Sequence, residues 1–126
     1  MAYTTIDDPT DYFNTNLVTG TSSNQNVTGM SFQPDWIWSK QRNATDRHRL
    51  VDSIRGTGKA LYSDRNDSEA TESNISSFNS DGYTLVGGSG MNENTSTYAQ
   101  WCWLAGGSAP AITYSVKVVS DSGNKY

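Results

Sequence analysis

The chain has 126 residues, the length of one ordinary domain, and its formal net charge is only −4. Ser, Thr and Asn supply 42 residues whereas Leu, Ile, Val and Phe together supply 20, which excludes a helical bundle or a coiled coil. No apolar run approaches the roughly 18 residues of a transmembrane helix. The 14 aromatic residues indicate instead a small all-β domain with an aromatic-rich interior.

Residues 1–15 combine large apolar side chains with carboxylates and contain no basic residue. We expect this segment to dock on its own domain or on a partner. The candidate contact residues are Tyr3, Ile6, Asp7, Asp8, Tyr12 and Phe13. Asp8-Pro9 indicates a turn or an extended segment, with a short helix that Asp8 caps as the alternative. The segment has neither the basic start nor the apolar stretch of a secretory signal.

Short strand-like runs alternate with turn residues through most of the chain. Strands are predicted at residues 12–18, 25–28, 35–41, 48–54, 59–62, 75–79, 83–86 and 97–104. Asp81-Gly82 is a hairpin signal between two of these runs, and residues 63–74 are predicted as a polar loop. Such closely spaced strands predict a β-sandwich, with a barrel as the alternative.

The four tryptophans lie in the two most strand-like runs, as Trp36-Ile37-Trp38 and Trp101-Cys102-Trp103. Alternation places both tryptophans of each run on one face of the strand. Exposed indole rings can form platforms for sugars, because a ring face packs on the apolar face of a pyranose. The strand-like context favours the core for all four. The single cysteine, Cys102, is predicted to be a buried and inert thiol.

The end of the chain has a different composition from the rest. Residues 105–111 resemble a linker, and residues 112–119 are predicted as a new strand that lacks its hairpin partner. We therefore expect the natural polypeptide to continue, or this strand to pair with another chain. The predicted organisation is a docking segment at 1–15, a β-sandwich at 16–107, and a linker with the first strand of a further β module at 108–126.

The sequence contains no recognisable catalytic or metal-binding motif. The one histidine, His48, is predicted to be a surface residue, and no Gly-x-Ser-x-Gly nucleophile motif accompanies it. The oxygen-rich run at 64–69 lacks the spacing of a calcium loop and is predicted to be solvated. We expect no enzymatic activity, no metal and no cofactor.

Basic residues are concentrated in one part of the chain. Residues 40–65 contain seven of the nine Lys and Arg side chains and carry a net charge of +4, so the remainder carries −8. A basic contact strip is predicted at Lys40, Arg42, Arg47 and Arg49. The acidic chain as a whole argues against nucleic acid as its partner, and an acidic protein segment or plain solvation are the alternatives.

Several segments together resemble one family. They are residues 1–9 (Met-Ala-Tyr-Thr-Thr-Ile-Asp-Asp-Pro), 12–15, 27–29, 32–40 (Phe-Gln-Pro-Asp-Trp-Ile-Trp-Ser-Lys), 48–56 (His-Arg-Leu-Val-Asp-Ser-Ile-Arg-Gly), 77–85 (Ser-Phe-Asn-Ser-Asp-Gly-Tyr-Thr-Leu) and 98–107 (Tyr-Ala-Gln-Trp-Cys-Trp-Leu-Ala-Gly-Gly). As a set they are similar to a lectin-like β-sandwich domain of tail fibres and related adsorption proteins of marine tailed phages, cyanophages among them.

This resemblance implies a β-sandwich of jelly-roll or lectin-like type with a structural and binding role in a virion. It implies the N-terminal part of a homotrimeric tail fibre, attached to other tail proteins through its N-terminus and supporting adsorption to a host glycan or receptor through distal parts. It implies neither catalysis nor membrane insertion. A capsid-decorating protein and a stand-alone carbohydrate-binding module are the alternatives.

Overall fold

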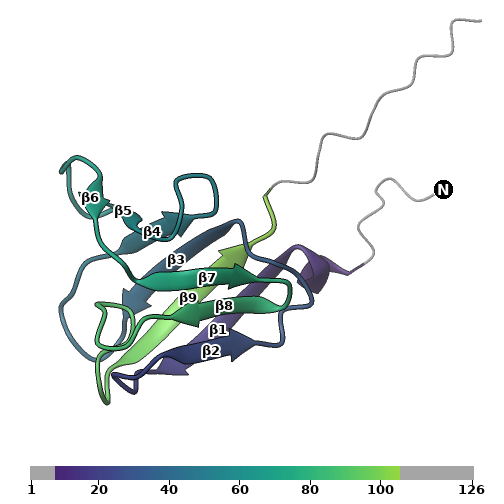
Figure 1. The fold of residues 1–126 in the computed structure, drawn as a ribbon, viewed down its shortest axis with the longest axis horizontal. Helices are drawn as coiled ribbons and strands as arrows, with labels where there is room; N and C mark the ends of the chain where they lie inside the picture. Colours follow the sequence, from purple (N-terminus) through teal and green to yellow (C-terminus); the bar gives the residue numbers. More distant parts are fainter. Residues whose placement is uncertain (1–7, 106–126) are drawn as a thin grey trace, which may run out of the picture.

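The computed structural model describes residues 8–105 and shows two antiparallel β-sheets packed face to face (Figure 1). In the larger sheet the strands run in the order β1 (Phe13–Thr19), β9 (Thr97–Trp103), β3 (Trp36–Gln41), β4 (Arg49–Asp52), β5 (Lys59–Tyr62) and β6 (Ala70–Thr71). In the smaller sheet the order is β2 (Gln25–Thr28), β8 (Gly82–Leu85) and β7 (Ile75–Asn79). The predicted β-sandwich is confirmed.

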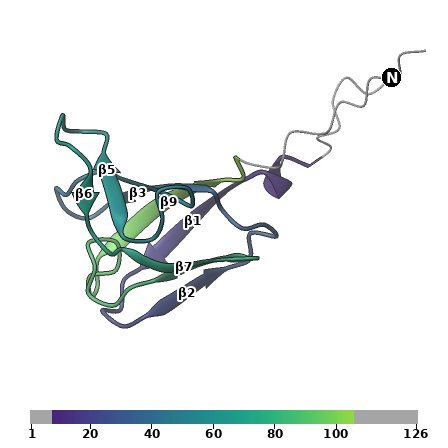
Figure 2. The ribbon, with the colours of Figure 1, turned by 45° about the horizontal axis from the view of Figure 1, so that its top comes forward.

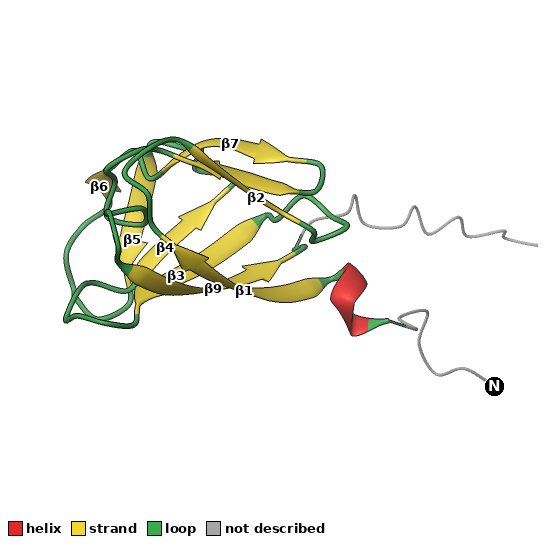
Figure 3. Cartoon of the chain, turned by 90° about the horizontal axis from the view of Figure 1, so that it is seen from below, coloured by secondary structure: helices red, strands yellow, loops and turns green. Residues whose placement is uncertain are grey.

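The two sheets form separate layers. β2 and β7 lie on one side of the layer that contains β1, β9 and β3 (Figures 2 and 3). The larger sheet therefore has an inner face toward β2, β8 and β7, and an outer face that the smaller sheet does not cover. This distinction decides which side chains are available for binding.

The predicted strands agree closely with those of the structure. The run at 48–54 is shorter than predicted, because the chain turns after Asp52, whose backbone oxygen accepts a hydrogen bond from the Gly56 N–H at 3.1 Å. The predicted polar loop at 63–74 contains the two-residue strand β6. The strand predicted at 112–119 lies outside the described residues.

The start of the described chain is a single turn of 3-10 helix, η1 (Pro9–Asp11), immediately before β1 (Figure 3). The Asp8 carboxylate accepts hydrogen bonds from the Thr10 backbone N–H at 2.9 Å and from its hydroxyl at 2.7 Å. Pro9 stands at the first helical position, where its missing N–H costs nothing. The short helix capped by Asp8 is thus the alternative that the structure adopts.

The core fills the space between the two sheets. From the larger sheet it takes Ile37, Val51, Tyr98 and Cys102, and from the smaller sheet Val27, Ile75, Tyr83 and Leu85. Cys102 is fully buried, and this burial raises the pKa of its thiol to about 12, which confirms the predicted buried thiol. Among the described residues no helix is long and apolar enough to cross a membrane.

Polar side chains also enter this core, and they bond to one another. The Tyr83 hydroxyl donates to the Gln100 amide oxygen, and the Gln100 amide nitrogen donates to the Ser39 hydroxyl at 3.3 Å. The Gln41 amide nitrogen donates to the Ser96 hydroxyl at 3.0 Å. Because a buried polar group is costly unless it is paired, these bonds allow glutamine and serine to occupy the inner face.

Candidate functional site

All four tryptophans lie on the outer face of the larger sheet. Exposure alternates along β3 and β9, and the buried positions are Ile37, Ser39 and Gln41 on β3 and Tyr98, Gln100 and Cys102 on β9. The tryptophans occupy the other, partly exposed positions. The prediction that they form the core is therefore wrong, and the inner face is built from the smaller and polar side chains instead.

Strand register brings these rings together into one aromatic row, which comprises Phe13, Trp103, Trp36, Trp38 and Trp101. Phe13 lies opposite Trp103, Trp103 opposite Trp36, and Trp101 opposite Trp38. Directly opposed residues of neighbouring strands are close enough for their side chains to pack. The row thus joins β1, β9 and β3 across the outer face.

The ring geometry shows continuous contact along this aromatic row. The Trp36 and Trp103 ring centroids are 4.4 Å apart with an interplanar angle of 29°, so each ring covers one face of the other. Phe13 packs on Trp103 at 4.9 Å, and Trp38 packs on Trp101 at 5.6 Å. The stacked Trp36 and Trp38 rings, 6.4 Å apart, connect these two groups. Such contacts hold the rings in fixed orientations and reduce the entropy that a ligand would otherwise have to remove.

His48 closes one end of the aromatic row. Its imidazole lies 5.7 Å from the Trp38 ring, and the Trp38 indole N–H donates to His48 Nδ1 at 3.1 Å. This hydrogen bond fixes the orientation of the imidazole ring relative to the Trp38 indole. His48 is partly buried against Trp38 and supports the row.

A hollow of about 410 Å³ lies beside Trp36, on the outer side of β3 and β4. Its lining residues are Asp35, Trp36, Asp52, Ser53, Ile54 and Ala105. Since β4 is the neighbour of β3 on the side away from Trp103, the hollow borders the side of Trp36 that faces away from Trp103. Ile54, which is 93% exposed, adds an apolar surface to it.

The oxygen atoms of this hollow are held in fixed positions. The Ser53 hydroxyl donates to Asp35 Oδ1 at 2.9 Å, and Arg55 Nε donates to Asp52 Oδ2 at 2.5 Å. Burial alone would raise the pKa of Asp52, but the hydrogen bonds from Arg55 outweigh it and lower the pKa. The hollow therefore offers oriented carboxylate acceptors next to an aromatic ring, a common composition of small-ligand sites.

The predicted docking segment is only partly described. Tyr3, Ile6 and Asp7 lie outside the described residues. Asp8 caps η1, while Tyr12 and Phe13 are 40% and 36% exposed. Phe13 belongs to the aromatic row, which links the end of this segment to the outer face.

The four residues of the predicted basic strip do not form one surface. Lys40 lies on the outer face, where its ammonium donates to the Gln41 and Ala44 carbonyl oxygens, and Arg42 is exposed. Arg47 lies with its guanidinium carbon 4.9 Å from the centroid of the Tyr62 ring.

Arg49 is the clearest correction to this strip. It is only 8% exposed and forms ion pairs with Asp46 at 2.5 Å and with Glu72 at 3.1 Å. It points inward because the residue alternates with the outer-facing Leu50, so it is a structural residue and not a contact for a partner. The surface contact predicted for Arg49 is wrong.

Residues 8–124 match a family described as Domain of unknown function (DUF7483). The chain belongs to this family. No curated protein and no solved structure matches it. The whole aromatic row lies within the DUF7483 match, and the match continues through the segment after residue 107.

The described part of this DUF7483 domain contains no group of three or more His, Cys, Asp or Glu side chains that could hold a metal ion. Its distinguishing features are the aromatic row and the hollow beside Trp36. The row presents preformed aromatic ring faces and the hollow adds fixed hydrogen-bond acceptors, a combination that is suited to binding.

Proposed function

We propose that this DUF7483 domain is a non-catalytic adhesion module that binds a glycan on its aromatic row. The observation that carries the proposal is the position of all four tryptophans on the outer face of the larger sheet, where they are partly exposed. A domain this poor in large aliphatic residues stabilises its core with Ile37, Tyr83 and Tyr98 and leaves its largest rings outside.

A glycan suits this surface because it needs both apolar and polar contacts. Sugar C–H groups pack on indole rings, while sugar hydroxyls need acceptors such as Asp35 and Asp52 in the hollow beside Trp36. The surface is open and shallow, so each contact is weak. Several copies that bind together would give strong attachment without a deep pocket.

The setting that we propose for this module is a phage tail fibre. In that setting the protein is a virion structural component, the fibre is a homotrimer, and the N-terminus attaches it to other tail proteins. The support for this setting is the sequence resemblance, together with Tyr12 and Phe13, which are exposed where the N-terminal segment meets β1.

Removal of residues 1–7 tests the attachment. The deletion ends before the Asp8 cap and before β1, so the isolated domain is expected to unfold at the same temperature as the full chain. Virions that carry the deletion are expected to lack the protein, measured by mass spectrometry of purified particles. Normal incorporation of the shortened chain would contradict attachment through this segment.

Trp36→Ala tests the glycan site itself. We expect it to weaken binding of a hexasaccharide ligand at least ~10-fold, since a lost aromatic contact costs about 1.5 kcal/mol or more. Calorimetric titration with cellohexaose, an alginate hexasaccharide and a sulfated carrageenan hexasaccharide measures the affinities. Trp36→Phe, which keeps an aromatic face, is expected to retain part of the binding.

Leu17→Ala is the matched control, because Leu17 is 68% exposed on the same face but lies opposite Ala99, outside the aromatic row. The chain has four tryptophans and all belong to the row, so a bound glycan should also shift the intrinsic fluorescence of the unmodified protein. Unchanged hexasaccharide affinity in Trp36→Ala, or no change in tryptophan fluorescence on binding, would contradict a glycan site on the aromatic row.

A further inference from the structure

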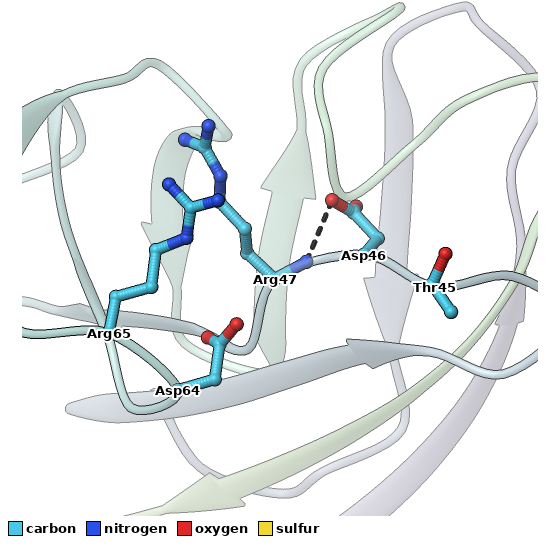
Figure 4. A pocket seen from close by; sticks show the side chains of 5 residues that line it. All are labelled: Thr45, Asp46, Arg47, Asp64 and Arg65. Atoms are coloured by element: carbon cyan, nitrogen blue, oxygen red, sulfur yellow. Dashed lines mark hydrogen bonds between the residues drawn. The ribbon is translucent and has the colours of Figure 1, made fainter.

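A second hollow lies between two loops at one end of the larger sheet (Figure 4). It has a volume of about 290 Å³ and is lined by Thr45, Asp46, Arg47, Asp64 and Arg65. One loop connects β3 to β4 and the other connects β5 to β6. Figure 4 shows the side chains of Arg47 and Arg65 directed to the same side of the hollow.

The two carboxylates of this hollow are engaged by its framework. Asp46 accepts hydrogen bonds from the Arg47 backbone N–H at 2.7 Å and from Arg49 at 2.5 Å (Figure 4 draws the first). Asp64 accepts from the His48 backbone N–H at 2.9 Å. These bonds fix the shape of the loops and direct the carboxylates to backbone and to the buried Arg49.

The two guanidinium groups, by contrast, are not neutralised inside the hollow. Within residues 8–105, Arg47 has no carboxylate partner in an ion pair, and it is held over the Tyr62 ring. Arg65 pairs with Asp67 at 3.2 Å, but both side chains are about half exposed. An exposed pair of this kind contributes only about 0–1 kcal/mol, so another anion can replace it.

Two guanidinium groups in one hollow form a site for an oxyanion. Each group presents planar N–H donors that match the two oxygens of a carboxylate or a sulfate, and the contact with the Tyr62 ring holds the Arg47 guanidinium in place. A bound anion would also offset the repulsion between the two positive charges. The hollow lies in the +4 segment of an otherwise acidic chain, which adds to the local attraction for anions.

One residue, His48, connects this hollow, in which Arg47 packs on the inward-facing Tyr62, to the aromatic row on the outer face. The His48 backbone donates to Asp64 in the hollow, and its imidazole accepts from Trp38 in the row. We infer that the hollow binds the carboxylate or sulfate groups of an acidic polysaccharide whose sugar rings pack on the aromatic row. The inference rests on the proposed function, and it specifies the class of glycan.

The test compares acidic and neutral ligands on charge-neutralising variants. The unmodified protein is expected to bind the alginate or the carrageenan hexasaccharide about tenfold more tightly than cellohexaose. Arg47→Gln and Arg65→Gln should each remove most of that preference. Arg42→Gln should leave it intact, because Arg42 is exposed and outside the hollow and the substitution removes the same charge. The alginate arm and the carrageenan arm distinguish carboxylate from sulfate.

Inorganic sulfate provides a second readout that does not depend on glycan binding. Titration with sulfate is expected to shift the amide resonances of residues 45–48 and 64–65, and this shift should be lost in Arg47→Gln. Sulfate binding without binding of any hexasaccharide would support the oxyanion site and contradict the glycan function. Equal affinity for acidic and neutral hexasaccharides would overturn the inference but not the proposed glycan binding on the aromatic row. A loss of the preference in Arg42→Gln equal to that in Arg47→Gln would overturn it in the same way.

Discussion

Arg49→Met is expected to lower the free energy of unfolding by about 3 kcal/mol, because it leaves two partly buried carboxylates without their cation. Arg49 is 8% exposed and joins Asp46 of the β3–β4 loop to Glu72, which follows β6. The Asp46 and Glu72 side chains are 22% and 25% exposed, so hydration of the two carboxylates limits the loss of stability. Urea denaturation at pH 7 measures the change, and Arg42→Met is the exposed control, expected to alter stability by less than about 0.5 kcal/mol.

The same cluster predicts a pH dependence with a definite sign. Burial alone would raise the pKa of Glu72, but the hydrogen bond from Tyr62 and the charge of Arg49 outweigh it, so the pKa is lowered. A carboxyl group whose pKa is lower in the folded state contributes stability above its unfolded pKa of 4.5 and loses it as the pH falls through the folded value. We expect the stability of the unmodified protein to decline below about pH 4.5.

Arg49→Met should flatten this decline, because loss of the guanidinium removes an interaction that lowers the pKa of Glu72 in the folded state. A variant that lost no stability at pH 7, or that kept the full acid dependence, would contradict the ion-pair cluster. Since Arg49 also fixes Asp46 in the wall of the oxyanion hollow, the variant should in addition weaken sulfate binding.

The strands could be predicted from the sequence because their signal is local. A period of two along β3 and β9, bounded by turn residues, identifies each strand without any knowledge of its neighbours. The pairing of Trp36 with Trp38, and of Trp101 with Trp103, on one face follows from the same period. The hairpin at Asp81-Gly82 is equally local and is present as predicted.

The face of the larger sheet on which the tryptophans lie could not be predicted from local sequence in this way. Large apolar rings favour the core on hydrophobicity alone, but here Ser39 and Gln100 occupy the inner face and bond to each other and to Tyr83. These partners are 61 and 17 residues apart, so the sequence gives no local sign that the polar face is satisfied. The signal that these two strands offer is that Ser39, Gln41 and Gln100 stand on the face opposite the tryptophans.

Long-range partners also explain the errors over charge. The run of basic residues predicts Arg49 at the surface, but its ion-pair partner Glu72 lies 23 residues further along the chain. Arg47 and Arg65 come from different loops, and only the packing of β3, β4 and β5 brings them to one hollow. Net charge along a segment therefore located the basic region but not the site within it.

Gly82→Ala is expected to destabilise the fold by at least about 3 kcal/mol, because there is no space for a methyl group where β8 meets β2. Gly82 has a φ of +141°, and a Cβ built on it would lie 1.9 Å from the Val27 carbonyl oxygen. Gly82 is paired with Thr28 in β2 and with Asn79 in β7. Removing the clash would therefore require β8 to move away from β2 within the smaller sheet.

Two other glycines separate the two causes of this loss. Gly88 has a φ of +69° but open space around it, so Gly88→Ala carries only conformational strain, about 1 kcal/mol. Gly58 has open space and no such φ, and Gly58→Ala should change stability by less than about 0.5 kcal/mol. Thermal and urea unfolding of the three variants should therefore rank Gly82 far above Gly88, and Gly88 above Gly58. Equal stability of Gly82→Ala and Gly58→Ala would mean that β2 and β8 do not approach as closely within the smaller sheet as described.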